Sequence, residues 1–481
     1  MRSGTEGESA QGQLVRALGL REGMAIQMGM IIGSGIFVVP ATIAGHLPAF
    51  GPILLVWVLG GLLILFGALS LAELSSVLPR AGGPYVYLRE GFGPLWAFLF
   101  TWNHYFINTA GSIAALAVAF ATYLGSFIPA LSPQNPLFSR SWVWFGRPVS
   151  FSVGWVQIAA MATIAIVTII NVRGVKLGGR VMNLFTAAKV AALLALIIAV
   201  AWSGKGSWSH LMPFWPERWT SGLTTGFGLA MISVLWAYDG WITVTLTAGE
   251  IKDPRRNVPL SLIWGTLAVI GIYVAANVAY VYVIPLGAMT GSPRIAADVA
   301  GLVLGPAGAL IIIAGILCSV FGALHGCVLG GPRCIYAAGA DGTIAAGFGM
   351  VHSRFHTPAV AIVTLGVWGG LLTLSGTYDQ IISYVVFGSW AFYALTALSV
   401  IALRVKLPEA PRPYKAWGYP YTTLLFVAVA CWFLANTLIK DPRNAIIGIA
   451  LLLVSLPFYF YWKIKRTGPV ETSSFPGGRK E

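Results

Sequence analysis

Two short glycine-containing interruptions of long apolar runs are the features of this sequence most able to do chemistry. Gly33-Ser34-Gly35 lies in the middle of the run over 23–46, and Asp239-Gly240 lies at a similar depth in the run over 222–250. Each interruption would break a helix and place N–H groups with partial positive charge near carbonyl groups with partial negative charge. A carboxylate beside an ammonium satisfies both kinds of helix end, so the pattern predicts an amino-acid zwitterion as ligand, although other small polar ligands also fit.

The two ends of such a zwitterion have different predicted partners. Backbone N–H groups should hold the carboxylate, near Ser34, Gly35 and Ile36. Backbone carbonyls should hold the amine, near Ile31, Ile32 and Trp236. A stripe of small residues that packs two helices together is the plainer explanation of Gly33-Ser34-Gly35. The matching interruption about 204 residues later favours a binding site.

Two charged residues lie inside apolar runs. Lys189 is about ten residues into the run over 179–203, roughly 15 Å from the membrane edge at ~1.5 Å per residue, which its side chain cannot easily span. Intramembrane lysines are functional by default, and Lys189 could be a permanent cationic tether or a group that loads and releases a proton. Asp239 could cap the second half of its broken helix or contact an ammonium or a cationic side chain.

The other titratable groups in or near the runs have plainer expected roles. Glu73 should pair with loop cations, Arg333 should anchor the membrane interface, and His104 and His325 should be satisfied core groups rather than proton relays. Near the end of the sixth run, a salt-bridge cluster is expected from Glu250, Lys252, Arg255 and Arg256.

Composition determines which elements position these residues. Of 481 residues, 57% are hydrophobic and 10% are charged, whereas soluble domains carry roughly 25% charged residues. A single soluble core stops growing near ~250–300 residues, so this apolar content excludes a soluble enzyme and predicts an all-α membrane protein that crosses the bilayer many times. The net charge of +14 does not require nucleic acid, because 22 of the 30 Lys and Arg lie in segments on one side of the predicted spans and seven lie on the other. This positive-inside bias predicts that both termini are cytoplasmic.

Reading the apolar runs as helices gives 12 predicted transmembrane helices. They lie near 23–46, 52–78, 92–124, 151–172, 179–203, 222–250, 259–286, 306–340, 359–376, 379–404, 420–439 and 444–463. The predicted units are a cytoplasmic N-terminal tail (1–22), a first five-helix repeat (23–203), a second five-helix repeat (222–404), helices 11 and 12 (420–463) and a cytoplasmic C-terminal tail (464–481). Because five is odd, the second repeat is inverted relative to the first, with broken helices 1 and 6 in corresponding positions.

Catalytic and cofactor motifs are missing from the predicted spans. No span has His-x-x-x-His or Glu-x-x-His, and the chain has no Gly-x-x-x-x-Gly-Lys-Ser/Thr, so we expect no enzyme, no metal, no cofactor and no ATP-driven transport. The four cysteines lie in apolar runs, which argues against a disulfide framework.

Several motifs resemble a known family. Residues 29–40, 78–87, 235–241 and 249–259 are similar to the amino acid–polyamine–organocation superfamily, and most similar to its L-type amino acid transporter branch with the bacterial serine/threonine-type and alanine/serine-type exchangers. The resemblance covers about residues 20–465. It implies the leucine-transporter-like 5+5 inverted repeat and sodium-independent transport, often as obligatory exchange.

The resemblance also implies roles for individual residues. Main-chain groups of the substrate would be bound around Ile31, Ser34 and Gly35, and Trp236, beside Ala237, would be an outer aromatic gate. Pocket-lining positions would be Ile107, Asn108 and Trp390. Lys189 would replace a sodium ion of relatives and tether helices 1 and 8 through Ser319, while Ala323 departs from the hydroxyl that the branch often has. The chain has no cysteine between 125 and 150, so no disulfide-linked heavy chain is expected.

These observations predict a secondary transporter in a bacterial-type inner membrane. We expect sodium-independent exchange or facilitated transport of neutral L-amino acids by alternating access. A carrier of cationic amino acids or polyamines, and a proton-coupled amino-acid symporter, are the alternatives. A pore-type channel is disfavoured by broken helices in an inverted repeat.

Overall fold

Helices account for nearly all of the computed structural model, which describes residues 14–131, 136–144, 147–292, 294–374, 378–440 and 442–465. Ten helical segments within these residues are long and apolar enough to cross a membrane. Their bounds are Leu20–His46, Phe50–Val77, Pro94–Leu124, Trp155–Val172, Val175–Ser203, Pro254–Val283, Pro306–Ala340, Gly388–Lys406, Tyr421–Ile439 and Ala445–Lys465. The all-helical membrane architecture predicted from composition is confirmed, whereas most of the two predicted tails, 1–13 and 466–481, lies outside the described residues.

The two remaining predicted spans are shorter than a full crossing. The sixth begins as α9 (Ser221–Ala237) and stops at the second interruption, after which only the four-residue α10 (Thr243–Leu246) and the 3₁₀ turn η4 (Ala248–Glu250) follow. The ninth is α16 (Ala359–Leu374), followed by residues outside the described set. The sixth span is therefore interrupted at 238–242, around the predicted Asp239-Gly240, and only short helical turns follow the break.

Four of the long segments are divided into shorter helices. The last of them, Ala445–Lys465, is divided between α19 (Pro442–Leu453) and α20 (Leu456–Lys465). The first consists of α1 (Leu20–Ile31) and α2 (Gly35–His46). The third consists of α5 (Pro94–Trp102), the π-helix η1 (Asn103–Thr109) and α6 (Ala110–Leu124). The segment Pro306–Ala340, which is the eighth predicted span, consists of α14 (Pro306–Gly330) and α15 (Pro332–Ala340). The division between α14 and α15 falls at Gly331 and Pro332, because proline has no backbone N–H to continue the helical hydrogen bonds. No proline lies within η1.

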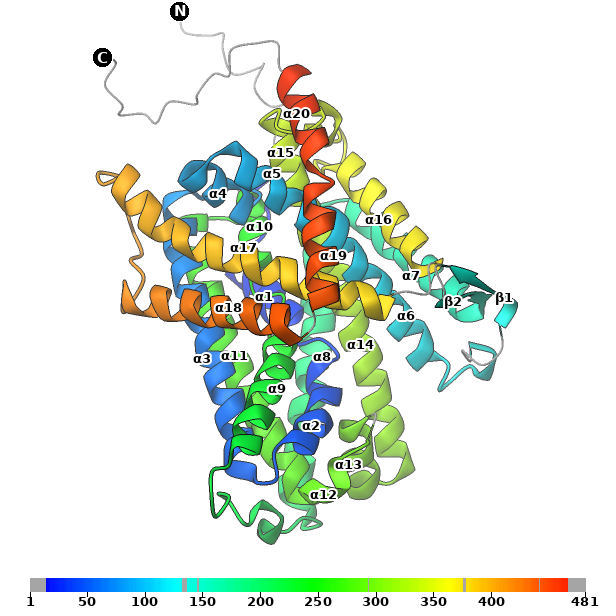
Figure 1. The fold of residues 1–481 in the computed structure, drawn as a ribbon. Helices are drawn as coiled ribbons and strands as arrows, with labels where there is room; N and C mark the ends of the chain where they lie inside the picture. The colour runs from blue at the N-terminus through cyan, green and yellow to red at the C-terminus, as the bar shows by residue number, and fades with distance from the viewer. Residues whose placement is uncertain are drawn as a thin grey trace, which may run out of the picture.

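The other elements complete the bundle. They are α3 (Phe50–Val77), α4 (Pro84–Phe92), η2 (Pro129–Leu131), α7 (Trp155–Val172), α8 (Val175–Ser203), η3 (Trp208–Leu211), α11 (Pro254–Val283), α12 (Leu286–Met289), α13 (Ile295–Leu304), η5 (Ala346–Gly349), α17 (Tyr378–Lys406), α18 (Tyr421–Lys440), α19 (Pro442–Leu453) and α20 (Leu456–Lys465). In Figure 1, α4, α5 and α15 lie at one end of the molecule and α12 and α13 at the other, and we name these the α15 end and the α13 end.

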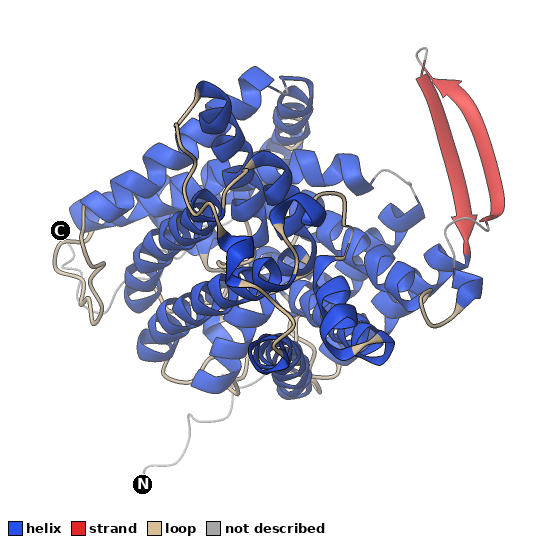
Figure 2. Cartoon of the chain, turned by 90° about the horizontal axis from the view of Figure 1, so that it is seen from below, coloured by secondary structure: helices blue, strands red, loops and turns tan. Residues whose placement is uncertain are grey.

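A β-hairpin interrupts the helical pattern after the third span. Strands β1 (Pro136–Trp144) and β2 (Arg147–Gly154) pair antiparallel and extend away from the helices (Figure 2). Our sequence interpretation predicted no strand here, and the hairpin lies between α6 and α7, outside the long helical segments that could cross a membrane. Its Phe, Val and Trp residues favour strands, but two strands without a third give a weak sequence signal.

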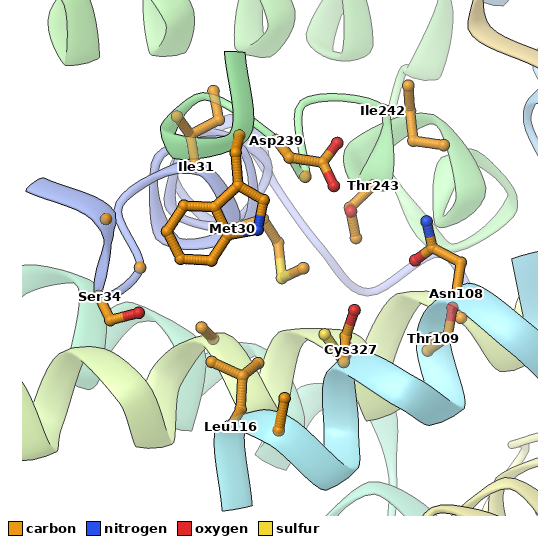
Figure 3. Close-up of a pocket in the computed structure, with 18 of the residues that line it drawn as sticks. Met30, Ile31, Ser34, Asn108, Thr109, Leu116, Asp239, Ile242, Thr243 and Cys327 are labelled. Carbon is orange, nitrogen blue, oxygen red and sulfur yellow. The ribbon is translucent and has the colours of Figure 1, made fainter. Parts of the chain in front are cut away.

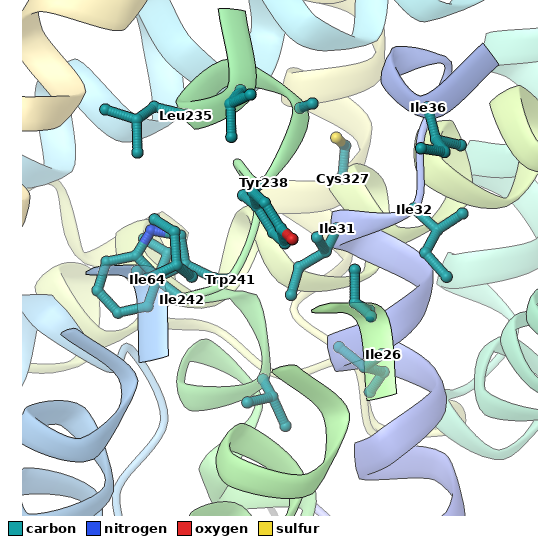
Figure 4. Close-up of a cluster of buried hydrophobic side chains, with 14 of the residues drawn as sticks. Ile26, Ile31, Ile32, Ile36, Ile64, Leu235, Tyr238, Trp241, Ile242 and Cys327 are labelled. Atoms are coloured by element: carbon teal, nitrogen blue, oxygen red, sulfur yellow. The ribbon is translucent and has the colours of Figure 1, made fainter. Parts of the chain in front are cut away.

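The broken first helix occupies the centre of the bundle. α1 packs against α8, α10, α11 and α14, and α2 packs against α9. Apolar side chains surround the region where the two breaks meet, and Figure 4 shows Ile31, Ile32, Ile36 and Tyr238 among them. Gly240, at φ +94°, approaches so closely that a β-carbon there would lie 2.8 Å from the Met30 carbonyl oxygen. The packing therefore brings both interruptions, about 200 residues apart in sequence, into one place.

Candidate functional site

A cavity of about 300 Å³ lies where the two breaks face the third and eighth spans (Figure 3). It is lined by Met30, Ile31, Gly33, Ser34, Gly35, His104, Asn108, Thr109, Ser112, Ala115, Leu116, Ala119, Trp236, Ala237, Asp239, Gly240, Ile242, Thr243, Leu246, Ala323, Cys327, Gly331 and Tyr393. Its volume is within the range of small-molecule sites. Trp236 is 39% exposed, and Leu116 and Ala119, nearer the α13 end, are half-buried, whereas Leu246 and Thr109, nearer the α15 end, are buried.

The N-terminus of α2 presents unpaired backbone donors beside this cavity. Among the described residues, the N–H groups of Ser34, Gly35 and Ile36 have no hydrogen-bond acceptor, whereas the next one, from Phe37, donates to the Ser34 carbonyl (3.1 Å). Consecutive N–H groups at a helix N-terminus, with the helix dipole behind them, form a site for an anion. A β-carbon on Gly35 would lie 3.0 Å from Cα and Cβ of Ala237, so this position has no space for a side chain.

The carbonyl groups at the end of α1 are occupied by side chains of other helices. The Ser319 hydroxyl on α14 contacts the carbonyls of Ile32 and Gly33 (both 3.1 Å). The Tyr273 hydroxyl on α11 lies 2.9 Å from the Ile31 carbonyl and 3.0 Å from that of Ala237. These contacts contradict the expectation that the Ile31 and Ile32 carbonyls are free to hold an amine. Tyr273 had no signal in the sequence, where it is one of 17 tyrosines.

Lys189 completes the set of donors to α1. Its side chain is fully buried, and Nζ donates to the carbonyl oxygens of Gly29 (2.6 Å), Ile32 (2.6 Å) and Ser319 (3.4 Å). An ammonium group has three N–H donors, and three acceptors surround this one. Lys189 and Ser319 thus lie together, as the sequence predicted, behind the cavity rather than in its wall.

Asp239 faces the cavity and does not cap a helix. One carboxylate oxygen accepts a hydrogen bond from the Tyr393 hydroxyl on α17 (2.7 Å). The N-cap position of α10 is Ile242, without a side-chain cap, which rules out the capping interpretation. Figure 3 shows the Asp239 side chain near that of Thr243 in the cavity. No Lys, Arg or His pairs with Asp239 within the part of the chain described.

Besides Lys189 and Ser319, four residues predicted to bind substrate do not line the cavity. Ile32 and Ile36 are fully buried in the apolar cluster around the break, and Ile107 is half-buried on η1. Trp390 is 3% exposed and packs against Phe433 (ring centroids 5.1 Å apart) and Tyr393 (5.9 Å), so it supports the Tyr393 ring. Asn108, Trp236 and Ala237 line the cavity as expected.

Sequence reasoning missed much of the deep part of the cavity. The residues not selected are Thr109, Ser112, Thr243, Cys327 and Tyr393, and His104 was expected to be a satisfied core group. His104 Nε2 is buried without a partner in the described structure, so this expectation was wrong. The four-residue spacing of His104, Asn108 and Ser112 was the signal that could have found this face. His325, in contrast, is satisfied: Nδ1 lies 3.1 Å from the Asn171 amide nitrogen and Nε2 lies 2.8 Å from the Gly178 carbonyl.

The α15 end is closed by two ion pairs, one of which is fully buried. Glu250 and Arg333 form a bidentate pair at 2.8 and 2.9 Å, both fully buried. Arg333 is therefore not an interfacial anchor, and Glu250 does not pair with Lys252, Arg255 or Arg256 as the sequence had suggested. Arg89 pairs with Asp341 (2.5 Å) across α4 and the end of α15.

Backbone and hydroxyl contacts add to this closure. The N–H groups of Ala17 and Leu18, just before α1, donate to the Glu250 carbonyl (both 2.9 Å). The Tyr85 and Thr343 hydroxyls lie 2.9 Å apart, and burial raises the pKa of the Tyr85 phenol, so it stays neutral. The N-terminal segment, α4, the turn after α10 and α15 therefore form one closed layer beneath the cavity.

Glu73 has the structural role expected of it. Its carboxylate accepts two hydrogen bonds from Arg404 (2.9 and 2.7 Å) and one from the backbone N–H of Ala416 (2.7 Å), and Arg412 lies 3.5 Å away. These contacts fix α3 to the end of α17 and the loop that follows. Glu73 lies outside the cavity, so we assign it no part in binding.

Comparison with known proteins gives one consistent result. A family model described as amino acid permease matches residues 18–456. The chain is 30% identical over 470 residues to the human b(0,+)-type amino acid transporter 1, covering 96% of this chain and 91% of that protein. It is 29% identical over 456 residues to the serine/threonine exchanger SteT of Bacillus subtilis, covering 94% of this chain and 98% of SteT. It is also 30% identical over 461 residues to the human large neutral amino acids transporter small subunit 2, covering 94% and 82%.

Proposed function

Since this chain belongs to the amino acid permease family, and is therefore an integral-membrane amino-acid transporter rather than an enzyme, we propose that it exchanges neutral L-amino acids without sodium. The proposed mechanism is alternating access in a leucine-transporter-like fold of 12 transmembrane helices. Its two inverted five-helix repeats would be residues 23–203 and 222–404, and helices 11 and 12 would lie outside the repeats.

The observation that carries this proposal is the set of unpaired donors at the α2 N-terminus. The N–H groups of Ser34, Gly35 and Ile36 lie beside the cavity with no acceptor in the described structure. A substrate carboxylate would satisfy them and interact favourably with the helix dipole. The Asp239 carboxylate, which has no cationic partner among the described residues, lines the same cavity and is the best-supported partner for the substrate ammonium, because the α1 carbonyls are already occupied. This assignment replaces our prediction that carbonyls hold the amine.

Sodium independence is supported by the donors around the end of α1. The carbonyls of Gly29, Ile31, Ile32 and Gly33 each accept a hydrogen bond from a side chain on α8, α11 or α14. A bound cation is therefore not needed to satisfy them. Lys189 supplies the positive charge at this position from within the protein.

Alternating access is supported by the asymmetric closure of the cavity. Lining residues nearer the α13 end and Trp236 are partly exposed, whereas the Glu250–Arg333 pair at the α15 end is fully buried. We propose that the α15 end faces the cytoplasm of a bacterial-type inner membrane, which puts both termini there and matches the positive-inside bias. The absence of a cysteine from residues 125–150 supports function without a disulfide-linked heavy chain.

Exchange in liposomes tests the proposal directly. Purified protein is reconstituted with a labelled amino acid inside, and unlabelled amino acids are added outside one at a time. We expect release to require an external amino acid and to be unchanged when potassium replaces sodium. Release into buffer alone at the same rate would contradict exchange, and dependence on sodium would contradict the proposed role of Lys189.

Transport of cationic amino acids is the second candidate. Asp239 is a carboxylate in the cavity with no cationic partner among the described residues, and an unpaired charge in a membrane interior is costly. A cationic substrate side chain could neutralise it. Arginine in the same panel distinguishes the two: strong exchange of arginine that is lost in Asp239→Asn, with alanine exchange retained, would favour this candidate.

A further inference from the structure

The third span presents one graded face to the cavity. His104, Asn108 and Ser112 line its deeper part, and Ala115, Leu116 and Ala119 line the part nearer the α13 end. The change from polar to apolar occurs within a single continuous segment. Residues 103–109 of this segment are the π-helix η1, and such turns occur frequently at functional sites. The two halves of the cavity therefore offer different environments to a bound molecule.

His104 is the most constrained member of this face. Its side chain is 8% exposed, and its ring stacks on Phe100 with centroids 5.2 Å apart and planes at 11°, which fixes the orientation of the ring. Its Nε2 atom has no hydrogen-bond partner in the described part of the chain. A buried polar atom without a partner costs about 1–3 kcal/mol. A ligand atom that bonds to His104 would recover that cost.

The residues around His104 also offer free hydrogen-bonding atoms. The hydroxyls of Thr109, Ser112 and Thr243 have no hydrogen-bond partner among the described residues, and the Asn108 amide nitrogen donates to Ser389, which leaves its carbonyl oxygen as an acceptor. Figure 3 shows Asn108 and Thr109 on the opposite side of the cavity from Ser34. We name His104, Asn108, Thr109 and Thr243 the polar floor.

We propose that the polar floor binds the side chain of the transported amino acid and selects neutral hydrogen-bonding side chains, hydroxyl or carboxamide, over aliphatic side chains of the same shape. This inference rests on the proposed function, in which the α2 N-terminus holds the substrate carboxylate. Ser34 lies on the opposite side of the cavity from Asn108 and Thr109 (Figure 3), and His104, one helical turn before Asn108, lines the same cavity, so a substrate held at Ser34 can direct its side chain toward this face.

The selectivity follows from which groups would lose their partners. An aliphatic side chain would exclude water from His104 and the threonine hydroxyls and give them no hydrogen bond. A hydroxyl or carboxamide can both donate and accept, so it suits an imidazole nitrogen, an amide oxygen and hydroxyls together. Sites built to hydrogen-bond a substrate group reject analogues that lack it far more strongly than apolar pockets reject an added hydroxyl.

Isosteric competitors test this proposal. Exchange of labelled alanine in proteoliposomes is inhibited with threonine or valine, and with asparagine or leucine, each pair having nearly the same shape. We expect wild-type protein to need roughly tenfold less threonine than valine for half-inhibition, as loss of one buried hydrogen bond implies. In His104→Leu the ratio of the half-inhibition concentration of valine to that of threonine should fall to about one. In His104→Gln, which keeps a hydrogen-bonding group, this ratio should stay above one.

A second variant separates polarity from size. Ala115→Val narrows the apolar part of the cavity, so it should weaken both members of each pair alike and leave the ratio unchanged. If His104→Leu no longer exchanges, the shift in melting temperature of purified protein with threonine or valine gives the same comparison without transport.

The outcomes distinguish this inference from the proposed function. An unchanged threonine-to-valine ratio in His104→Leu, or a wild-type preference for valine or for arginine, overturns the polar floor while exchange itself stands. If wild-type protein exchanges no amino acid, the proposed function fails first. A wild-type preference for threonine that disappears only in the leucine variant supports the inference.

Discussion

At the scale of single residues, the break in the first helix is stabilised by side chains that arrive from three other helices. Lys189, Ser319 and Tyr273 donate to carbonyls at the end of α1, where the break interrupts the regular hydrogen bonds of the helix inside a membrane. The N–H groups on the other side of the break have no such partners among the described residues. The protein therefore satisfies the negative end of the break itself and leaves the positive end for a ligand.

Gly35 tests whether this positive end binds substrate. A valine there would collide with Ala237, where even a β-carbon would lie at 3.0 Å, and would displace the N–H groups from the cavity. We expect substrate binding to weaken by on the order of 10- to 100-fold, the effect of losing one or two charge-assisted hydrogen bonds of about 1.5–3 kcal/mol. Binding is measured by substrate-induced thermal stabilisation of purified protein.

Gly45 is the matched control for Gly35. It lies on the same helix and is exposed, and a β-carbon added there would meet no atom within 4 Å among the described residues. Gly45→Val should bind substrate as wild type does. If Gly35→Val and Gly45→Val bind substrate equally well, the carboxylate does not bind at the N-terminus of α2.

Trp236 tests the partly exposed side of the cavity. Its indole ring lies 3.7 Å from the position a β-carbon would take on Gly35, and the residue is 39% exposed, so it can cover a bound substrate. We expect Trp236→Ala to weaken binding of bulky substrates about tenfold, since burial of an aromatic side chain contributes roughly 1.5–3 kcal/mol. The affinity for alanine should change less. Half-inhibition concentrations for phenylalanine and alanine give the comparison. An equal effect on both would mean that Trp236 only packs within the bundle and does not cover the substrate.

At the scale of elements, α1 is attached to α8 along most of its length. Three α8 residues at three-residue spacing contact α1 in order: Asn183 donates to Glu22 (3.0 Å), Thr186 to the Ala25 carbonyl (3.0 Å), and Lys189 to Gly29 and Ile32 (both 2.6 Å). Residues three apart share one face of a helix. Any movement that opens the α15 end must therefore shift α1 and α8 together or break buried hydrogen bonds.

The Glu250–Arg333 pair is the element-scale contact whose loss should change the conformation most. Removing one partner leaves an unpaired buried charge, which costs about 3–5 kcal/mol. We expect Arg333→Leu to destabilise the closed α15 end, lower the melting temperature and increase the reactivity of Cys327 in the cavity toward a maleimide added from that side. Glu250→Leu combined with Arg333→Leu should recover part of the lost stability, because neither charge is then left alone.

A surface pair provides the control for this variant. Arg80 and Glu90 pair at 2.7 Å with side chains 43% and 33% exposed, and such pairs contribute about 0–1 kcal/mol. Arg80→Leu should leave Cys327 reactivity as in wild type. If Arg333→Leu behaves like Arg80→Leu, the buried pair does not hold the α15 end closed.

At the scale of the whole molecule, the predicted orientation has a direct test. Glu217, in the loop between α8 and α9, and Lys415, between α17 and α18, are both exposed and lie on opposite sides in the predicted topology. Single cysteines placed there, in a background without the four native cysteines, should react differently with an impermeant maleimide. We expect Glu217→Cys to react in intact cells and Lys415→Cys to react only after permeabilisation. The reverse labelling pattern would show that the protein has the opposite orientation in the membrane.

The sequence predicted the helical architecture better than the site. Long apolar runs and their two interruptions are strong local signals, so the spans and the two broken helices could be predicted. Partners across the bundle could not, because the pairing of Glu250 with Arg333, or of Asp239 with Tyr393, depends on side-chain directions that spacing does not determine. The resemblance placed Ile107 and Trp390 on pocket-lining positions, but Ile107 is half-buried on η1 and the Trp390 ring packs against Phe426 on α18 (centroids 6.0 Å apart), and neither lines the cavity.

Ion coupling is a property of the whole transport cycle, and in this protein we expect it to depend on a single residue, Lys189. Three carbonyl acceptors around Nζ match the three donors of an ammonium, whereas a neutral amine would turn a lone pair toward one of them. If Lys189 stays charged and holds α1 against α14 throughout the cycle, it cannot take up and release a proton. The rate of uptake into proteoliposomes should therefore not change when an inward proton gradient is imposed. Lys189→Met should lose the tether and slow exchange, whereas Lys176→Met, an exposed lysine near the start of the same helix, should not. Gradient-driven accumulation in wild type that vanishes in Lys189→Met would mean instead that Lys189 carries a proton in each cycle.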